Sequence, residues 1–402
     1  MTADFPFGPV TPAEGQAIMR AVRADRPMTK VSFAYGGDAW VVHRHDACRR
    51  LLEDRRFVRK PFADGRPVPY PFEFPEFLTK TLQFMDPPDH TRLRRLVTKA
   101  FTMRRVERLR PSTQALADRL VDAMVADGAR TADLVGSYAL PLPIQVIGDL
   151  LGVPSEGRAN FVQWSHALLS TSGMEMDEVV GHTTALYGYL AELMAARRAE
   201  PRDDLLSALA AARDADDRLT DAEIVEIAML LVLGGFDNTA NFMEQGVLAL
   251  LLNPDQRAVL AEDVDGRITR AVEELLRHAG MVIDQPVTGA AGLVPFVADE
   301  DVELADVLIR RGEAVMVDVS TANHDEQAFD TPDRFDVRRP RNQHLTFSHG
   351  LHRCLGASLA QMELQVGIGT LFKRLPGLAL AGDPVYLEGV LTGGMTEFPV
   401  TW

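Results

Sequence analysis

Apolar residues recur every three to four positions along most of the chain, which predicts a mainly helical protein. The pattern runs from residue 90 to 207 and returns in two later helices, one after Pro254 through Arg277 and one from Leu355 to Arg374. Because proline interrupts a helix, breaks in the first stretch are expected at Pro111, Pro141-Leu142-Pro143 and Pro154.

Strand-like patterns are confined to short runs, which predicts small sheets. Residues 31–35 and 39–43 flank a turn at Gly36-Gly37-Asp38, and similar runs lie near 302–309 and 314–319. We therefore expect a mainly α fold with small β-sheets. It should form a single domain over residues 1–402, with a β-richer N-terminal lobe over about residues 1–60.

The most apolar helix is expected in the middle of the chain. Thr220, with Glu223 three residues later, has the spacing of a capping box. From Ile224 to Leu252 the pattern predicts one long helix that is hydrophobic on nearly every face, and such a helix belongs inside a large protein.

Residues 60–89 combine many prolines with many aromatic residues. Prolines at this density exclude a long helix. A flexible linker has no use for aromatic side chains, so we expect a loop that covers a pocket. The aromatic residues are Phe62, Tyr70, Phe72, Phe74, Phe77 and Phe84.

The composition excludes some classes of partner. The 57 acidic and 42 basic residues give a net charge of −15, which argues against binding to nucleic acid. The N-terminus has no pattern of a secretory signal, and no apolar run is long enough to span a membrane. We expect a cytoplasmic protein.

The two cysteines, Cys48 and Cys354, lie too far apart in sequence to indicate a disulfide framework. Cys48 is interpreted as a buried, reduced thiol. Cys354 lies in the segment Phe-Ser-His-Gly-Leu-His-Arg-Cys-Leu-Gly, residues 347–356. There Gly350 allows a tight turn, Phe347 covers the sulfur, and the following helix directs its positive end at a thiolate. Gly356 leaves room for a flat cofactor.

This segment resembles the haem-binding loop of the cytochromes P-450, and the similarity extends over essentially the whole chain. The resemblance implies haem b (iron protoporphyrin IX) with Cys354 as the iron ligand. It also implies that His90, Arg94 and His352 contact the haem propionates. Many bacterial relatives place a propionate-binding arginine where Phe296 stands in our alignment, so these three residues would carry the propionates unless another basic side chain substitutes.

The resemblance also points to the central stretch Leu233-Gly234-Gly235-Phe236-Asp237-Asn238-Thr239. Two adjacent glycines in a helix need a reason, such as a cofactor or O2 close to Gly235. Asp237 occupies the family's acidic position, but Asn238 stands where a threonine is usual and Thr239 follows one residue later. We expect Asp237, Asn238 and Thr239 to take part in proton delivery.

Two further groups of charged residues match the family. Glu274, Arg277 and Arg334 resemble a buried structural triad. Eight basic residues fall between Arg92 and Arg110, and we interpret them as a docking face for a ferredoxin that is served by a ferredoxin reductase.

The resemblance implies an enzyme that uses O2 to oxidise a small organic molecule, with hydroxylation in secondary metabolism as the expected reaction. Because Asn238 replaces threonine, radical C–C or C–N coupling of aromatic substrates, such as aromatic cyclic dipeptides, is an alternative. A non-catalytic haem-thiolate sensor is an alternative of another class. The pocket is expected to include parts of residues 62–84, Met281 to Ile283, Trp164, Phe236 and Met395.

Overall fold

The computed structural model describes residues 3–5, 26–33, 37–66, 81–169, 175–216, 219–279, 294–386 and 394–402. The chain forms two compact units, one of Met1–His90 with Glu273–Cys354 and one of Thr91–Val272 with Leu355–Trp402. The single domain expected from the sequence stays a prediction.

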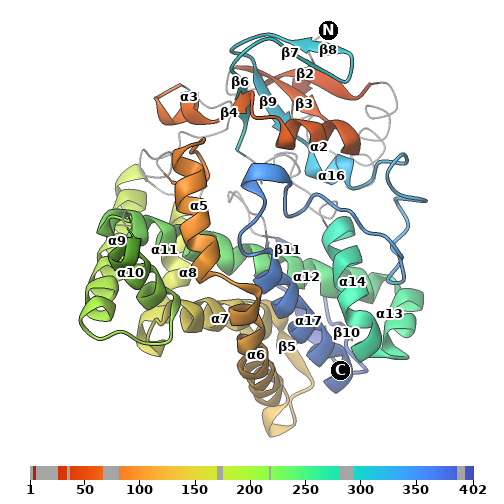
Figure 1. Cartoon of the computed structure of the whole chain (residues 1–402). Coiled ribbons are helices and arrows are strands. Elements are labelled where there is room, and N and C mark those ends of the chain that lie inside the picture. Colours follow the sequence, from red (N-terminus) through yellow and green to blue (C-terminus); the bar gives the residue numbers. More distant parts are fainter. Residues whose placement is uncertain are drawn as a thin grey trace. The chain divides into compact units, whose positions relative to one another are not determined.

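The first unit contains the larger sheet, shown in Figure 1. Six strands lie in the order β1-β2-β3-β9-β6-β4, and only the pairs β1–β2 and β3–β9 are parallel. The strands are β1 (Ala3–Phe5), β2 (Met28–Phe33), β3 (Asp38–Val42), β4 (Phe57–Val58), β6 (Phe296–Ala298) and β9 (Ala314–Val317). The sheet thus joins the start of the chain to residues some 250 positions later.

A helix and a hairpin complete the core of this unit. Helix α2 (His45–Glu53) contributes Ala47, Cys48 and Leu51 to an apolar cluster with the sheet. The hairpin of β7 (Val302–Leu304) and β8 (Val307–Ile309) joins the same cluster. Short helical turns follow at α3 (Lys60–Ala63), α16 (Val319–Ala322) and η3 (Gly350–His352). The strands expected near 302–309 and 314–319 are confirmed.

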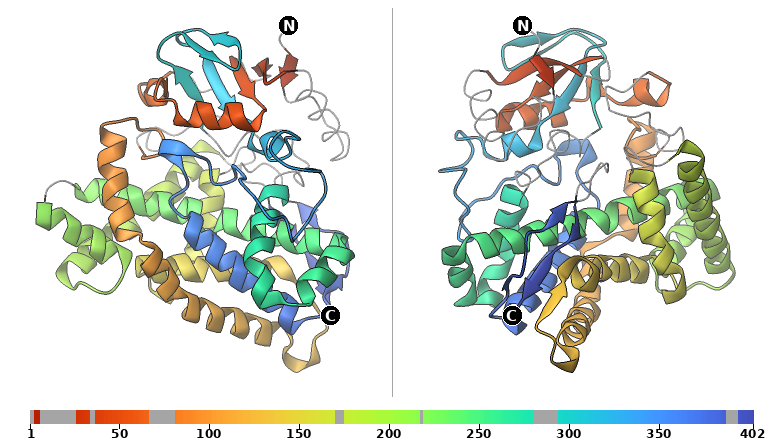
Figure 2. Two further views of the ribbon diagram at one scale, coloured as in Figure 1. Left: turned by 45° about the vertical axis from the view of Figure 1, so that its right-hand side comes forward. Right: turned by 180° about the vertical axis from the view of Figure 1, so that it is seen from behind.

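The second unit is mainly helical. Helix α17 (Ala357–Arg374) packs along α6 (Met103–Met124) and α12 (Asp237–Leu252), as Figure 2 shows. The remaining helices are α5 (Asp89–Ala100), η1 (Ala126–Gly128), η2 (Val135–Ala139), α7 (Pro141–Leu151), α8 (Ser155–Leu169), α9 (Met176–Ala199), α10 (Leu205–Asp216), α11 (Asp221–Gly235), α13 (Pro254–Ala261) and α14 (Val264–Ala279). Helices α5 and α14 each begin in one unit and end in the other.

Small strands lie beside these helices. One sheet has the order β10-β13-β5, and β11 pairs with β12. The strands are β5 (Thr131–Asp133), β10 (Ala379–Leu380), β11 (Val385–Tyr386), β12 (Met395–Glu397) and β13 (Pro399–Thr401). The strands and turns expected after Leu378 are confirmed. Within the described residues, no helix is both long enough and apolar enough to cross a membrane.

Two of the three expected proline breaks are confirmed. Pro141 occupies the first turn of α7, where its missing N–H costs nothing, and Pro154 lies between α7 and α8. The break at Pro111 is wrong, because this residue lies inside α6. Both Pro111 and Glu107, whose carbonyl loses its helical donor, are exposed, so water can replace the lost bond.

The prediction of a single long central helix is also wrong. The capping box is confirmed, with the Thr220 hydroxyl accepting from the Glu223 N–H, but the helix ends at Gly235 and α12 begins at Asp237. Gly234 and Gly235 lower the helix propensity at this point. The helix expected after Pro254 is likewise two helices, α13 and α14.

Candidate functional site

Cys354 lies in a tight loop that leads into α17. Its backbone N–H donates to the Phe347 carbonyl (2.8 Å), which closes the loop on itself. Gly356 is the N-cap of α17, so the positive end of that helix begins two residues after the cysteine. The Cys354 side chain is exposed, and a thiolate there is available to a ligand.

Gly350 fixes the shape of this loop. Its φ of +65° lies in the left-handed region, and a Cβ at this position would collide with the Leu52 carbonyl oxygen of α2. The Phe347 ring is half-buried and lies 5.7 Å from the His344 ring. The tight turn predicted for Gly350 is therefore confirmed.

Cys48 has a different environment from Cys354. It is completely buried in α2 and its Sγ donates to the Val42 carbonyl (3.3 Å). Burial raises the pKa of the Cys48 thiol well above its usual value, so this sulfur stays protonated. The interpretation of Cys48 as a buried thiol is confirmed, and Cys354 is the cysteine available for chemistry.

The first unit brings together three residues that the sequence singled out. The rings of His90 and His352 lie 4.4 Å apart between centroids, and Phe296 lies 6.2 Å from His352. The Arg59 guanidinium lies 4.3 Å from the centre of the Phe296 ring. Sequence reasoning missed Arg59, which places a positive charge directly beside Phe296.

Arg59 is held firmly in this position. Its guanidinium donates to the carbonyls of Gln83 (2.7 Å) and Val294 (3.1 Å), and its side chain is buried. The Asp86 carboxylate accepts from the backbone N–H groups of Arg59 and Lys60 and carries a compensating charge nearby. Burial raises the pKa of Asp86, and these N–H bonds oppose that effect. Arg94 is half-buried one helical turn after His90 on α5.

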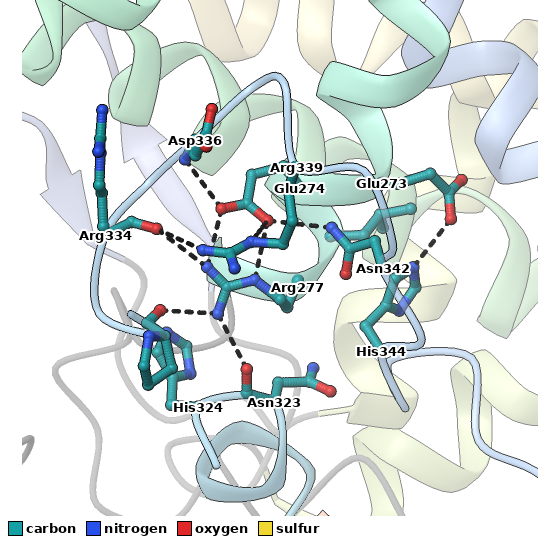
Figure 3. Close-up of polar contacts among 12 residues, drawn as sticks. Glu273, Glu274, Arg277, Asn323, His324, Arg334, Asp336, Arg339, Asn342 and His344 are labelled. Carbon is teal, nitrogen blue, oxygen red and sulfur yellow. Dashed lines mark hydrogen bonds and ion pairs between the residues drawn. The ribbon is translucent and has the colours of Figure 1, made fainter. Parts of the chain in front are cut away.

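Glu274 is the hub of a buried ion-pair network in the same unit (Figure 3). Its carboxylate accepts two bonds from Arg277 (both 2.8 Å) and one each from Arg339 (2.9 Å) and Asn342 (3.0 Å). Both Glu274 and Arg277 are fully buried. Because several charges and amides satisfy one another, the network braces the chain from α14 to residue 342.

The prediction that Arg334 is the third member of this network is wrong. Arg334 contributes only its backbone carbonyl, which accepts from Arg277 (3.3 Å) and Arg339 (3.0 Å), and its exposed side chain runs away from Glu274 in Figure 3. The second arginine on Glu274 is Arg339, five residues later. The spacing of the motif pointed to the right loop, but only the turn of the backbone decides which side chain faces inward.

Gly234 and Gly235 differ in their surroundings in the second unit. A Cβ on Gly235 would press on Ile147 of α7 (3.1 Å), so this glycine permits close helix packing. Gly234 is exposed and a Cβ there would meet nothing, and Asn238 is exposed one turn later. Gly234 and Asn238 therefore mark an open face of this helix pair.

Thr239 faces the protein interior instead. It is buried, and its hydroxyl donates back to the Gly235 carbonyl (3.1 Å) within the helix. The Asn238 amide lies 3.5 Å from the Gly234 carbonyl, a weak contact. The one-residue shift of the threonine thus turns its hydroxyl away from the face on which Asn238 lies.

Asp237 begins a buried polar row on α12. Asp237, Asn241 and Glu244 follow at the spacing of four and then three residues that places side chains on one helix face, and all three are buried. Glu244 accepts from the Met395 N–H (3.0 Å), and the Asn241 amide lies against Gly394. Sequence reasoning missed Asn241 and Glu244, although the spacing of polar residues in an apolar helix is a signal that could have revealed them.

These residues fit a haem. A single exposed cysteine, Cys354, suits an iron that brings its own chelating ring. His90, His352 and Arg94 are donors suited to carboxylates such as propionates.

Some of the expected pocket lies outside the described residues, namely Met281 to Ile283 and residues 67–80. Phe62, Phe84, Trp164, Phe236 and Met395 are all buried. Their role as substrate contacts stays a prediction.

The basic stretch from Arg92 to Arg110 is partly neutralised. Arg92 pairs with Glu223 (2.5 Å), Arg105 and Arg108 pair with Asp203 (3.2 and 3.4 Å), and Arg110 pairs with Glu107 (2.8 Å). Arg95 and Arg104 are exposed at the surface of α5 and α6.

A family model described as "Cytochrome P450" matches residues 144–276 and 287–376. Nocardicin C N-oxygenase of Nocardia uniformis subsp. tsuyamanensis is 41% identical over 100% of this chain and 99% of its own. Mycinamicin IV hydroxylase/epoxidase of Micromonospora griseorubida is 42% identical over 94% of this chain and 92% of its own. The crystal structure of HinD with NMFT and NO superimposes with a TM-score of 0.90 at 40% identity and full coverage of both chains.

Proposed function

The chain belongs to the cytochrome P450 family, and from this premise we propose that it hydroxylates a small natural product at a haem bound by Cys354. The family identifies an oxidoreductase that uses haem b, O2 and a redox partner. The observation that carries the proposal is the loop from Phe347 to Gly356, which presents the exposed Cys354 at the start of α17.

The haem, when bound, supplies the activation of O2, and a thiolate ligand favours O–O cleavage. The protein supplies the rest. Cys354 is the proposed iron ligand, and His90, Arg94 and His352 are the proposed propionate donors. Arg59 adds a buried positive charge beside Phe296, which compensates for the arginine that this position lacks.

Proton delivery is proposed for the start of α12. The Asp237 carboxylate is buried and can hold and release a proton. Asn238, on the open face, can hold a water through its amide, while the Thr239 hydroxyl stays engaged with Gly235. We therefore assign the delivery of protons to Asp237 with water held by Asn238.

The names of the relatives support a type of reaction. They are named for an N-oxygenation and for a hydroxylation and epoxidation, all of them insertions of oxygen. This favours hydroxylation of a natural product over radical coupling. We propose a ferredoxin as the electron donor, because exposed Arg95 and Arg104 on α5 and α6 suit an acidic partner.

The proposal is tested by product analysis. The purified holoenzyme is screened against natural products for a spectral shift of the haem, and each binder is incubated with ferredoxin, its reductase and 18O2. A product that carries one 18O atom supports hydroxylation. A dehydrogenated dimer without label would show coupling, and binding without consumption of reduced cofactor would show a sensor; either result would overturn the proposal.

A further inference from the structure

Glu244 is a buried acid in a largely buried helix, and the proton delivery proposed above does not use it. It is 1% exposed on α12, seven residues after Asp237 and on the same face. The 16-residue helix has twelve buried residues, and Glu244 is one of its two buried acids. Burial of an acid costs free energy, so its position needs a reason.

The surroundings of Glu244 fix its carboxyl group. Its Oε2 accepts from the Met395 N–H of β12 (3.0 Å), while Gly394 leaves room for the Asn241 amide between Glu244 and Asp237. Asp133 ends β5 just before η2, and its carboxylate accepts from the N–H groups of Gly136 (2.9 Å) and Phe398 (2.7 Å).

Burial raises the pKa of Glu244 to about 8. The hydrogen bond from the Met395 N–H opposes this shift, and the negative charges of Asp237 and Asp133 add to it. Other ionisable groups on packed helices are Tyr138 of η2, which donates to the Gly367 carbonyl (2.8 Å), and the buried Glu363 of α17. Burial raises the pKa of both Tyr138 and Glu363, which disfavours the charged form of each.

We infer that Glu244 is a positioning residue for the proposed proton delivery and acts through Asp237: its carboxyl group adds or removes a negative charge on the buried face of α12 that both acids share. The inference rests on the proposed function, because it assigns proton delivery to Asp237.

The sign of the effect follows from the charges. Below pH about 8 the Glu244 carboxyl group is protonated and neutral, and above that pH it adds a negative charge to the face of α12 that holds Asp237. A negative charge disfavours the loss of a proton from a neighbouring acid. Seven helical residues span about 10 Å, and at an effective dielectric constant of about 20 two unit charges at this distance change a proton affinity roughly tenfold. Proton delivery from this face therefore weakens as the pH rises.

The test compares wild type with Glu244→Gln, because glutamine keeps the shape and the acceptor for the Met395 N–H but cannot ionise. The first measurement is the fraction of reduced cofactor that ends in product rather than peroxide, from pH 6 to about pH 9.5. Wild type should lose product several-fold on the alkaline side, whereas Glu244→Gln should keep it nearly constant. Glu244→Ala, which also loses the acceptor, shows the effect of structural damage alone.

The second measurement does not depend on turnover. Infrared spectra of the holoenzyme should contain the C=O band of a protonated carboxyl that disappears as wild type passes pH about 8 and is missing in Glu244→Gln. A band that does not titrate, or identical product profiles in the two proteins, would overturn the role of Glu244. A wild-type protein that consumes no O2 would instead overturn the proposed function, on which this role depends.

Discussion

At the scale of single residues, one of the two departures from the family expected from the sequence, Asn238 in place of threonine, lies in the first turn of α12. Asn238 occupies the exposed position, and the buried Thr239 hydroxyl bonds to Gly235. A hydroxyl that already donates within its own helix cannot also donate to a water on the open face. Asn238 is therefore the residue through which the rest of the site is expected to order that water.

The first prediction concerns this position. Asn238→Thr should lower the fraction of reduced cofactor lost as peroxide by about two- to tenfold, less than the roughly hundredfold or more that a whole proton-transfer group contributes. The matched control is Asn238→Val, which has the shape of threonine without its hydroxyl and should increase peroxide. Equal partitioning in all three proteins would show that position 238 has no part in proton delivery.

The same turn shows what sequence reasoning reaches at this scale. The identity of Cys354 and the tight turn at Gly350 were predictable, because each position admits few residue types. Glu244 was missed although its spacing from Asp237 and Asn241 could have revealed it, but its bond from the Met395 N–H joins residues far apart in sequence and could not be predicted. The titration of Glu244 near pH 8, argued above, is the second prediction at this scale.

At the scale of elements, the Glu274 network joins α14 to the loop before residue 342. Arg339 is buried and donates to Glu274 (2.9 Å) and to the Asp330 carbonyl (2.8 Å). Loss of one partner from a buried ion pair leaves the other charge without compensation and lowers stability. Loss of an exposed side chain changes the free energy of unfolding little.

The third prediction follows from that difference. Arg339→Ala should lower the free energy of unfolding by about 3 to 5 kcal/mol, because Glu274 loses a charge partner. Arg334→Ala, the matched control, keeps the backbone carbonyl that Arg277 uses and should change stability by less than about 0.5 kcal/mol. Denaturant unfolding of the two variants checks this order, and the reverse order would restore Arg334 as the third member.

The element boundaries show where sequence reasoning stops. The capping box at Thr220 and the breaks at Pro141 and Pro154 were predictable because they depend on neighbours along the chain. Pro111 remained inside α6 because packing against α17 holds that helix together despite one lost bond. The division between α11 and α12 also depends on contacts with other helices, which the sequence does not display.

At the scale of the whole molecule, charge bears on where a redox partner docks. The chain carries a net charge of −15, yet Arg95, Arg104 and Arg108 are exposed on α5 and α6. A basic patch on a negatively charged protein favours the approach of an acidic partner to that patch.

The fourth prediction uses this contrast. The double variant Arg104→Ala/Arg108→Ala should slow the second-order reduction by ferredoxin about two- to tenfold at low salt and flatten its dependence on salt. Arg310→Ala removes an equally exposed arginine of the other unit and should leave the rate unchanged. Stopped-flow reduction at several salt concentrations checks the effect, and equal rates for both variants would place the donor elsewhere.

The central claim is the bond between Cys354 and the haem iron, and it is tested most directly by the absorption spectrum of the reduced carbonyl complex. Cys354→Ser should abolish the absorption band that is typical of a thiolate ligand and lower the haem content, whereas Cys48→Ala should keep both, because Cys48 is buried in α2. An unchanged band in Cys354→Ser would contradict the account.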